Sequence, residues 1–158
     1  MKRVFTVILL FFFLLLKVNF AQAQDQDQIP MVGPQEIEEA IAREKGRVLI
    51  VNFWATWCGP CRAEIQELVK IRTMYDPDDL SIIGPSLDFD PGAIPPFIER
   101  MGINYTVLHA SDHVMNHYGI ESIPYTMIFD REGQKTHEFK ELVETEKLLE
   151  IIQKLITK

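Results

Sequence analysis

Hydrophobic and polar positions change their period along the chain in a way that separates strands from helices. Val48–Trp54 (VLIVNFW) is almost continuously apolar and rich in β-branched residues, which is typical of a strand buried on both faces of a sheet. Directly after it, Ile65, Leu68 and Val69 recur at helical spacing and predict a helix over 58–72. The pattern therefore predicts a buried strand that leads straight into a helix.

The same criteria predict an alternating order of elements in the rest of the chain. The expected helices cover 35–45, 95–101, 112–118 and 144–156, and the expected strands cover 80–83, 105–108, 125–129 and 135–139. The turn Asp130–Gly133 joins the last two strands into a hairpin. Strand and helix alternate first and a hairpin comes last, so the predicted fold class is α/β, with a central mixed sheet flanked by helices.

The first 23 residues have the pattern of a secretory signal peptide. Lys2 and Arg3 form a basic start, Val4–Leu16 is an apolar run, and Ala21-Gln22-Ala23 supplies small residues for cleavage. The sequence therefore predicts export, with the protein soluble in the periplasm or another extracytoplasmic space after cleavage.

Retention of this segment as an inner-membrane anchor is the alternative. The apolar run is shorter than the about 20 residues of a bilayer-spanning helix, but residues 4–20 would suffice if Lys17 snorkels. Residues 24–34 are polar and contain Pro and Gly, so they are predicted to be a linker. Residues 35–158 then form a single domain.

Composition and charge narrow the classes of partner. The chain is 47% hydrophobic and 10% aromatic, which is enough for a packed core. Its formal net charge is −7, and loss of Lys2, Arg3 and Lys17 with the signal peptide would take it to −10. An acidic surface argues against nucleic acid or an anionic membrane as a partner of the folded part.

The two cysteines, Cys58 and Cys61, are the only ones in the chain, and they fall at the predicted strand-to-helix junction. A disulfide over so short a loop stabilises weakly, by about 2 kcal/mol against about 3 for a fifteen-residue loop. A zinc site would need about four ligands, of which this pair supplies two. Reversible redox chemistry is the leading hypothesis, because the helix N-terminus favours a Cys58 thiolate. Pro60 is tolerated in the first helical turn.

Two stretches around these residues resemble a known family. Val51–Glu64 (VNFWATWCGPCRAE) and Gly119–Gly133 (GIESIPYTMIFDREG) are similar to the motif blocks of the thioredoxin superfamily, and within it of TlpA/ResA-like exported thiol–disulfide oxidoreductases. The resemblance extends from about Gln35 to the C-terminus. It implies a thioredoxin fold with a helical insert between the central strands, and electron exchange with protein cysteines without a cofactor.

The resemblance also implies roles for individual residues. Cys58 matches the exposed attacking thiol, Cys61 the buried resolving thiol, and Trp57 the aromatic residue beside the active site. Pro124 matches a proline that is cis in the superfamily and faces the cysteines. The backbone of Ile123 would then pair with a substrate strand.

Three positions modify these expectations. Asn52 stands where thioredoxins proper carry a buried Asp, and the TlpA/ResA-like branch often combines this Asn with a Glu at the position of Glu64. On a helix Glu64 lies about 60° from Cys61, at the rim of the apolar face, where partial burial would raise its pKa and make it a base; an exposed glutamate is the alternative. Tyr125 replaces the usual Thr or Ser, and either narrows the substrate groove or points into the core.

The direction of electron flow and the partners are also expectations of the resemblance. Gly59-Pro60 between the cysteines resembles reducing thioredoxins and would contribute to the substrate site, so a reductant of disulfides in exported proteins is favoured. Electrons would come from a membrane thiol donor. The substrate would be an apocytochrome c haem-site disulfide, as in cytochrome c maturation, or a copper-handling protein.

Other functions of the same fold remain open. A thiol peroxidase would need Thr at the position of Ala55, and a copper-binding chaperone would usually have its cysteines one residue further apart. A module that only recruits partners is a third possibility. His113 and His117 lie four residues apart on a predicted helix, but the sequence places no third metal ligand, so a solvated helix face is favoured and no metal is expected.

Overall fold

A six-stranded sheet forms the centre of the computed structural model, which describes residues 29–158. The strands are β1 (Met31–Val32), β2 (Val48–Phe53), β3 (Leu80–Ser86), β4 (Thr106–Ala110), β5 (Tyr125–Phe129) and β6 (Lys135–Phe139). Their order in the sheet is β1-β4-β3-β2-β5-β6; the first four are parallel, and β5 and β6 run antiparallel to their neighbours. The mixed sheet predicted from the sequence is confirmed.

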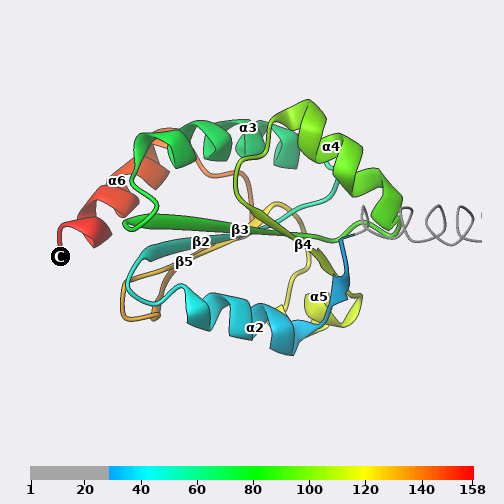
Figure 1. The fold of residues 1–158 in the computed structure, drawn as a ribbon, viewed down its shortest axis with the longest axis horizontal. Coiled ribbons are helices and arrows are strands. Elements are labelled where there is room, and N and C mark those ends of the chain that lie inside the picture. The colour runs from blue at the N-terminus through cyan, green and yellow to red at the C-terminus, as the bar shows by residue number, and fades with distance from the viewer. Residues whose placement is uncertain (1–28) are drawn as a thin grey trace, which may run out of the picture.

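Helices cover both faces of this sheet (Figure 1). The helices are α2 (Pro34–Arg43), α3 (Gly59–Met74), α4 (Ile94–Met101), α5 (His113–Tyr118) and α6 (Thr145–Ile156), with a short 3-10 turn over Pro91–Ala93. Figure 1 shows α3, α4 and α6 on one face and α2 and α5 on the other. No helix between residues 29 and 158 has the length and apolar character needed to cross a bilayer.

Each face of the sheet has its own hydrophobic core because β2 is buried on both sides. Ile50 and Leu68 belong to the cluster that packs α3 and α6 against one face, while Val51 and Ile37 belong to the cluster under α2 and α5. All six residues of β2 are buried. Burial on both faces explains why every residue of this strand except Asn52 is apolar.

Most predicted helices and strands match the structure to within two residues at each end, and two differences are larger. Met31 and Val32, inside the predicted linker, pair with His109 and Ala110 of β4 as an edge strand, so the ordered domain begins before Gln35. A strand of two residues is too short for periodicity to reveal. The predicted signal peptide and anchor, and residues 24–28 of the linker, lie outside the described residues.

β3 is also longer than predicted, because it continues through Gly84 and Pro85 to Ser86. Pro85 lacks an N–H group, but its carbonyl oxygen still accepts from the Trp54 N–H at 3.2 Å. The strand therefore reaches the same edge of the sheet as the end of β2.

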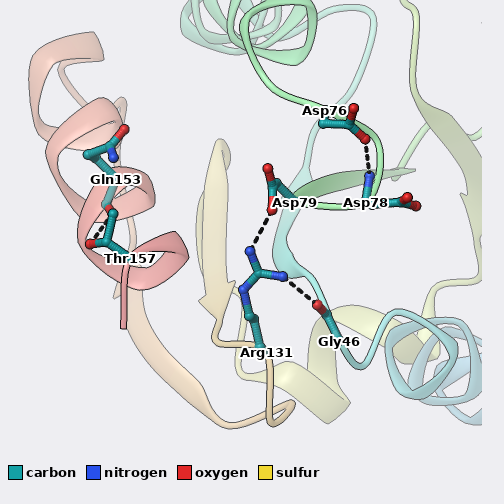
Figure 2. A network of polar contacts seen from close by, with 7 residues as sticks. All are labelled: Gly46, Asp76, Asp78, Asp79, Arg131, Gln153 and Thr157. Atoms are coloured by element: carbon teal, nitrogen blue, oxygen red, sulfur yellow. Dashed lines mark hydrogen bonds and ion pairs between the residues drawn. The ribbon is translucent and has the colours of Figure 1, made fainter.

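The sheet edge opposite the cysteines is held by Arg131 in the β5–β6 turn (Figure 2). Its guanidinium donates to the Gly46 carbonyl at 2.8 Å and to Asp79 Oδ1 at 2.6 Å. Gly46 has φ +100, which favours glycine, and its N–H donates to the Arg131 carbonyl at 2.8 Å. The starts of β2 and β3 are thus tied to the hairpin.

Gly84 provides a test of packing near the site. A β carbon at this position would lie 2.8 Å from Trp54 Nε1 and 3.0 Å from Tyr105 Cε2. Because the Trp54 side chain is fully buried, we expect Gly84→Ala to lower the free energy of unfolding in urea by about 1–3 kcal/mol.

Gly59→Ala is the matched control for stability, since a β carbon there meets no atom within 4 Å. It should leave the urea midpoint close to that of the wild type. Equal midpoints for Gly84→Ala and Gly59→Ala would contradict the close packing of Trp54 on β3.

Candidate active site

Cys58 and Cys61 form a disulfide at the point where the chain leaves β2 and enters α3. Cys58 is the N-cap of α3, and its Sγ accepts from the Cys61 N–H at 3.2 Å. Pro60 lies in the first turn of α3, where a backbone N–H would have no acceptor within the helix, so its absence costs no hydrogen bond. The predicted strand-to-helix junction therefore places Cys58 Sγ at the positive end of the helix dipole.

The two sulfurs differ in exposure less than the resemblance implies. Cys61 is 0% exposed, as expected for a resolving cysteine, but Cys58 is only 5% exposed rather than openly exposed. It reaches solvent through a cavity that it helps to line. Attack on a partner would therefore require the partner segment to enter this cavity.

The loop before β5 lies beside the disulfide. The Ile123–Pro124 peptide bond is cis, as the resemblance implies. The carbonyl oxygen of Ile123 lies 3.7 Å from Cys58 Sγ. Phe53 at the end of β2 pairs with Tyr125 at the start of β5, and this register brings the two loops together.

A cavity of about 570 Å³ opens over Cys58. Four of the predicted substrate-site residues line it, and the complete lining is Trp57, Cys58, Gly59, Pro60, Leu87, Phe89, Ala110, Asp112, Met115, Glu121, Ser122 and Ile123. Trp57 is 59% exposed and Phe89 is 82% exposed, so the rim carries large apolar side chains that face solvent. Such a rim suits contact with an apolar segment of another molecule.

One wall of this cavity was not predicted from the sequence. Leu87 and Phe89 follow β3, Ala110 ends β4, and Met115 lies on α5. A usable signal was available, because the carboxyl ends of parallel strands meet at one edge of a sheet. The residues after each predicted parallel strand were therefore candidates.

Tyr125 is not part of the cavity, which corrects its assignment to the substrate site. Its side chain is 2% exposed, and its ring lies 5.9 Å from that of Phe53. Its hydroxyl donates to the Tyr118 carbonyl at 3.4 Å. Tyr125 therefore points into the core under α2 and α5, where it packs with Phe53 and Met127.

Glu64 is buried more deeply than a position at the rim of the helix suggests. It is 1% exposed, which rules out the exposed alternative. Oε2 accepts from Asn52 Nδ2 at 3.1 Å and Oε1 accepts from Thr126 Oγ1 at 3.2 Å; Asn52 Nδ2 also donates to Thr126 Oγ1 at 2.8 Å. The carboxyl group therefore joins α3 to β2 and β5.

Burial raises the pKa of Glu64 from 4.5 to about 7, because desolvation outweighs the hydrogen bonds from Thr126, Asn52 and the Val143 backbone. A carboxyl group with this pKa exchanges protons near neutral pH. It stands three residues after Cys61, on the next turn of α3.

The histidine pair predicted on one helix face is solvated. His113 and His117 are both exposed on α5, and His117 Nε2 lies 2.7 Å from Glu38 Oε1 of α2. Among residues 29–158 no group of three or more His, Cys, Asp or Glu side chains is arranged to hold a metal ion.

Comparisons with known proteins agree with this geometry. The chain matches the sequence profile of the AhpC/TSA family over residues 21–137. It is 28% identical to the thiol-disulfide oxidoreductase ResA of Geobacillus thermodenitrificans over 98 residues, which are 61% of this chain and 56% of that protein. It is 32% identical to the thiol:disulfide interchange protein HelX of Rhodobacter capsulatus over 91 residues, 56% of this chain and 49% of that one. The chain thus spans about half the length of these two relatives.

A solved structure gives the same picture for the fold. A thiol:disulfide interchange protein of the thioredoxin family from Chlorobium tepidum superposes with a TM-score of 0.67 at 26% identity, over 73% of this chain and 83% of that one. The predicted thioredoxin fold is confirmed, and so is the resemblance to ResA-like proteins.

The burial of Glu64 makes the stability of the fold depend on pH. The pKa of Glu64 in the folded protein, about 7, lies above the ordinary value of 4.5. Glu64 therefore makes its full contribution to the free energy of unfolding below pH 4.5, and this contribution is lost as the pH rises through about 7. The free energy of unfolding of the wild type should therefore fall between pH 4 and pH 8, and in Glu64→Gln this fall should be smaller by about 3 kcal/mol. Urea unfolding of the oxidised proteins at the two pH values measures the difference.

Glu67→Gln is the matched control on the same helix. Glu67 is ion-paired with Lys70 at 2.7 Å, and this pair lowers its pKa instead of raising it. The Glu67 variant should keep the pH dependence of the wild type between pH 4.5 and pH 8. If Glu64→Gln keeps it as well, the carboxyl group of Glu64 does not titrate as its burial implies.

Proposed function

The chain belongs to the AhpC/TSA family, and from that premise we propose that it is a thiol–disulfide oxidoreductase that reduces disulfides in other exported proteins. The observation that carries the proposal is the Cys58–Cys61 disulfide at the head of α3, opening into a cavity with the Ile123 carbonyl 3.7 Å from Cys58 Sγ. A disulfide placed for stability alone needs neither a cavity nor an exposed apolar rim.

The proposed reaction begins with the reduced pair. The Cys58 thiolate attacks one sulfur of a partner disulfide, a bond forms between the two sulfurs, and the other partner sulfur leaves as a thiolate that takes up a proton. The Cys61 thiolate then attacks Cys58 Sγ, which forms the Cys58–Cys61 disulfide and releases the second partner thiolate. Two electrons pass to the partner, and the protein ends in the oxidised form that the structure describes.

Glu64 is the proposed acceptor for the Cys61 proton. Cys61 is fully buried, so its thiol cannot lose a proton to bulk solvent directly. A carboxyl group one turn along α3 with a pKa of about 7 is half ionised at neutral pH and can take the proton. Asn52 cannot accept it as a carboxylate would, and supports Glu64 by a hydrogen bond instead.

The substrate binds, in this proposal, as an extended segment in the cavity. The backbone of Ile123 pairs with it, while Trp57, Gly59 and Pro60 form the wall next to Cys58. The apolar rim favours an unfolded or flexible partner segment with apolar residues beside its cysteine. The candidate substrates in this proposal are an apocytochrome c haem-site disulfide and a copper-handling protein.

The direction and the cellular setting are further parts of the proposal. The basic start, the apolar run and Ala21-Gln22-Ala23 support export. In the space outside the cytoplasm a disulfide persists unless it is reduced. Electrons would then come from a membrane thiol donor. The Gly59-Pro60 pair between the cysteines favours a reductant.

Peroxide reduction is the function to test against this one, because the matched profile is that of the AhpC/TSA family. Ala55 stands three residues before Cys58, at the position where a peroxidase of this fold needs a Thr hydroxyl. Its side chain is a fully buried methyl group and offers no hydrogen bond to a peroxide oxygen. Turnover of hydrogen peroxide at a rate comparable to disulfide reduction would favour the peroxidase.

Trapping tests the proposed attack. In Cys61→Ser the resolving thiol is missing, so we expect a stable mixed disulfide between Cys58 and its partner. It should be visible on non-reducing gels of exporting cells and identified by mass spectrometry of the captured protein. Cys58→Ser, which keeps the buried thiol, should capture at least about tenfold less. Equal capture by the two variants, or capture by neither, would sink the proposal.

The resolving step tests Glu64. With a preformed mixed disulfide on Cys58, release of the partner should accelerate with pH through about 7 in the wild type. In Glu64→Gln, release at pH 7.5 should be about 10²-fold slower, and the rise near pH 7 should disappear. Stopped-flow fluorescence measures both, with Glu67→Gln as the control. An unchanged pH profile in Glu64→Gln would show that Cys61 loses its proton by another route.

A further inference from the structure

The carboxylate of Asp88 holds the loop that carries Cys58. It is 5% exposed and follows the end of β3. Thr56 N–H donates to Oδ2 at 2.9 Å and to Oδ1 at 3.2 Å, Thr56 Oγ1 donates to Oδ1 at 2.6 Å, and Ser86 Oγ donates to Oδ2 at 2.7 Å. Both donors of Thr56 are therefore committed to one buried carboxylate.

Thr56 is fixed on its third polar group as well. Arg62 Nε, in the first turns of α3, donates to the Thr56 carbonyl at 3.1 Å. The Cys58 N–H donates to the Ala55 carbonyl at 3.1 Å and closes the turn. The two residues before Cys58 thus have little freedom to move away from the helix.

Asp88 is itself held rigidly by its backbone. Its N–H donates to Ser86 Oγ at 3.1 Å, and its carbonyl oxygen lies 2.8 Å from Nε2 of His109, which is 1% exposed. Within residues 29–158 the Asp88 carboxylate takes part in no ion pair, so neutral donors alone satisfy it. Burying a carboxyl group without a cation costs desolvation free energy, so a geometric role explains its position better than stability does.

This contact also joins the two walls of the cavity. Leu87 and Phe89, on either side of Asp88, line it together with Trp57 and Cys58. The Leu87 N–H donates to the Trp54 carbonyl at 2.8 Å, which adds a second tie between the two segments. The Thr56–Asp88 contact therefore sets where one wall stands relative to Cys58.

We propose that Asp88 is a positioning residue that, through Thr56, holds Cys58 in the geometry of disulfide formation and so keeps the cysteine pair reducing. The physical effect is one of position. A fixed loop raises the effective concentration of one thiol at the other, which favours the disulfide over the dithiol. The reductive use of the pair rests on the proposed function, but the equilibrium itself does not.

The test is the glutathione equilibrium of the purified protein, in which the Cys58–Cys61 disulfide and two reduced glutathione molecules give the dithiol and one oxidised glutathione. For Asp88→Asn we expect the equilibrium to move about tenfold toward the dithiol, which is about 30 mV less reducing. The amide of the variant has one acceptor oxygen, whereas the donors of Thr56 and Ser86 use both oxygens of the Asp88 carboxylate. Asp90→Asn is the matched control: it removes the same charge from the same loop, but the Asp90 carboxylate binds Gly92 N–H and not Thr56.

Substitutions of Thr56 separate positioning from charge. Thr56→Val removes the hydroxyl donor without changing charge, and should move the equilibrium toward the dithiol about threefold or more. Thr56→Ser keeps both donors and should stay within about twofold of the wild type. In the Asp88→Asn/Thr56→Val double variant the shift should be smaller than the product of the two single shifts, because both break one contact.

Several outcomes overturn the proposal. If Asp88→Asn has the same glutathione equilibrium as the wild type, the contact does not control the disulfide. If the equilibrium shifts in Asp88→Asn but not in Thr56→Val, or shifts equally in Asp90→Asn, only the charge matters and the positioning role is wrong. If Asp88→Asn does not fold, the Thr56→Val and Thr56→Ser pair decides. Failure of the wild type to reduce protein disulfides would refute the proposed function alone, since the glutathione equilibrium remains measurable.

Discussion

The position of β2 at the centre of the sheet is the constraint on which the site depends. It is paired with β3 on one side and β5 on the other, and all its residues are buried. Because β3 is parallel to β2, the segment after Ser86 emerges at the same edge as Cys58. Because β5 is antiparallel to β2, the residues before Tyr125 also lie at that edge. Three segments far apart in sequence therefore converge on one disulfide.

Two buried carboxyl groups beside this junction have different surroundings and suit different tasks. Glu64 accepts hydrogen bonds from side chains of β2 and β5, and desolvation still raises its pKa to about 7. A group of this kind gains and loses a proton easily, so it suits proton transfer. Asp88 receives a backbone N–H and two hydroxyl donors. Such a group suits the fixing of a loop.

The sequence predicted the elements whose pattern is local, and it missed contacts that arise only from topology. The bounds of β5 and β6 agree with the prediction residue by residue, because a turn with Gly133 separates two short runs with β-favouring residues. Helical spacing placed Glu64 at the rim, but its full burial depends on Thr126, which is 62 residues away. The Thr56–Asp88 contact joins residues 32 positions apart, and no local sequence pattern around either residue predicts it.

Two other positions show the same limit. The sequence left Tyr125, which follows Pro124, open between the substrate groove and the core, and its ring packs against Phe53 in the core. β1 was taken for linker because two residues show no period, and only its pairing with β4 defines it. The residues next to a position in the sequence do not show which side of the sheet its side chain faces. That depends on the register of the whole strand.

Several features that stability alone would not favour lie around the disulfide. An ionised Glu64 costs the fold about 3 kcal/mol above pH 7, because its pKa is raised from 4.5 to about 7. Phe89 is 82% exposed and Trp57 is 59% exposed at the cavity rim, where water contacts apolar surface. Away from this region single large apolar side chains such as Met31, Met74 and Leu142 are also exposed, but the two cores are buried and Arg131 ties the starts of β2 and β3. Local departures of this kind mark functional sites in a fold whose other levels agree. Their meeting at Cys58 is therefore a physical argument for chemistry at this edge of the sheet, independent of the resemblance to other proteins.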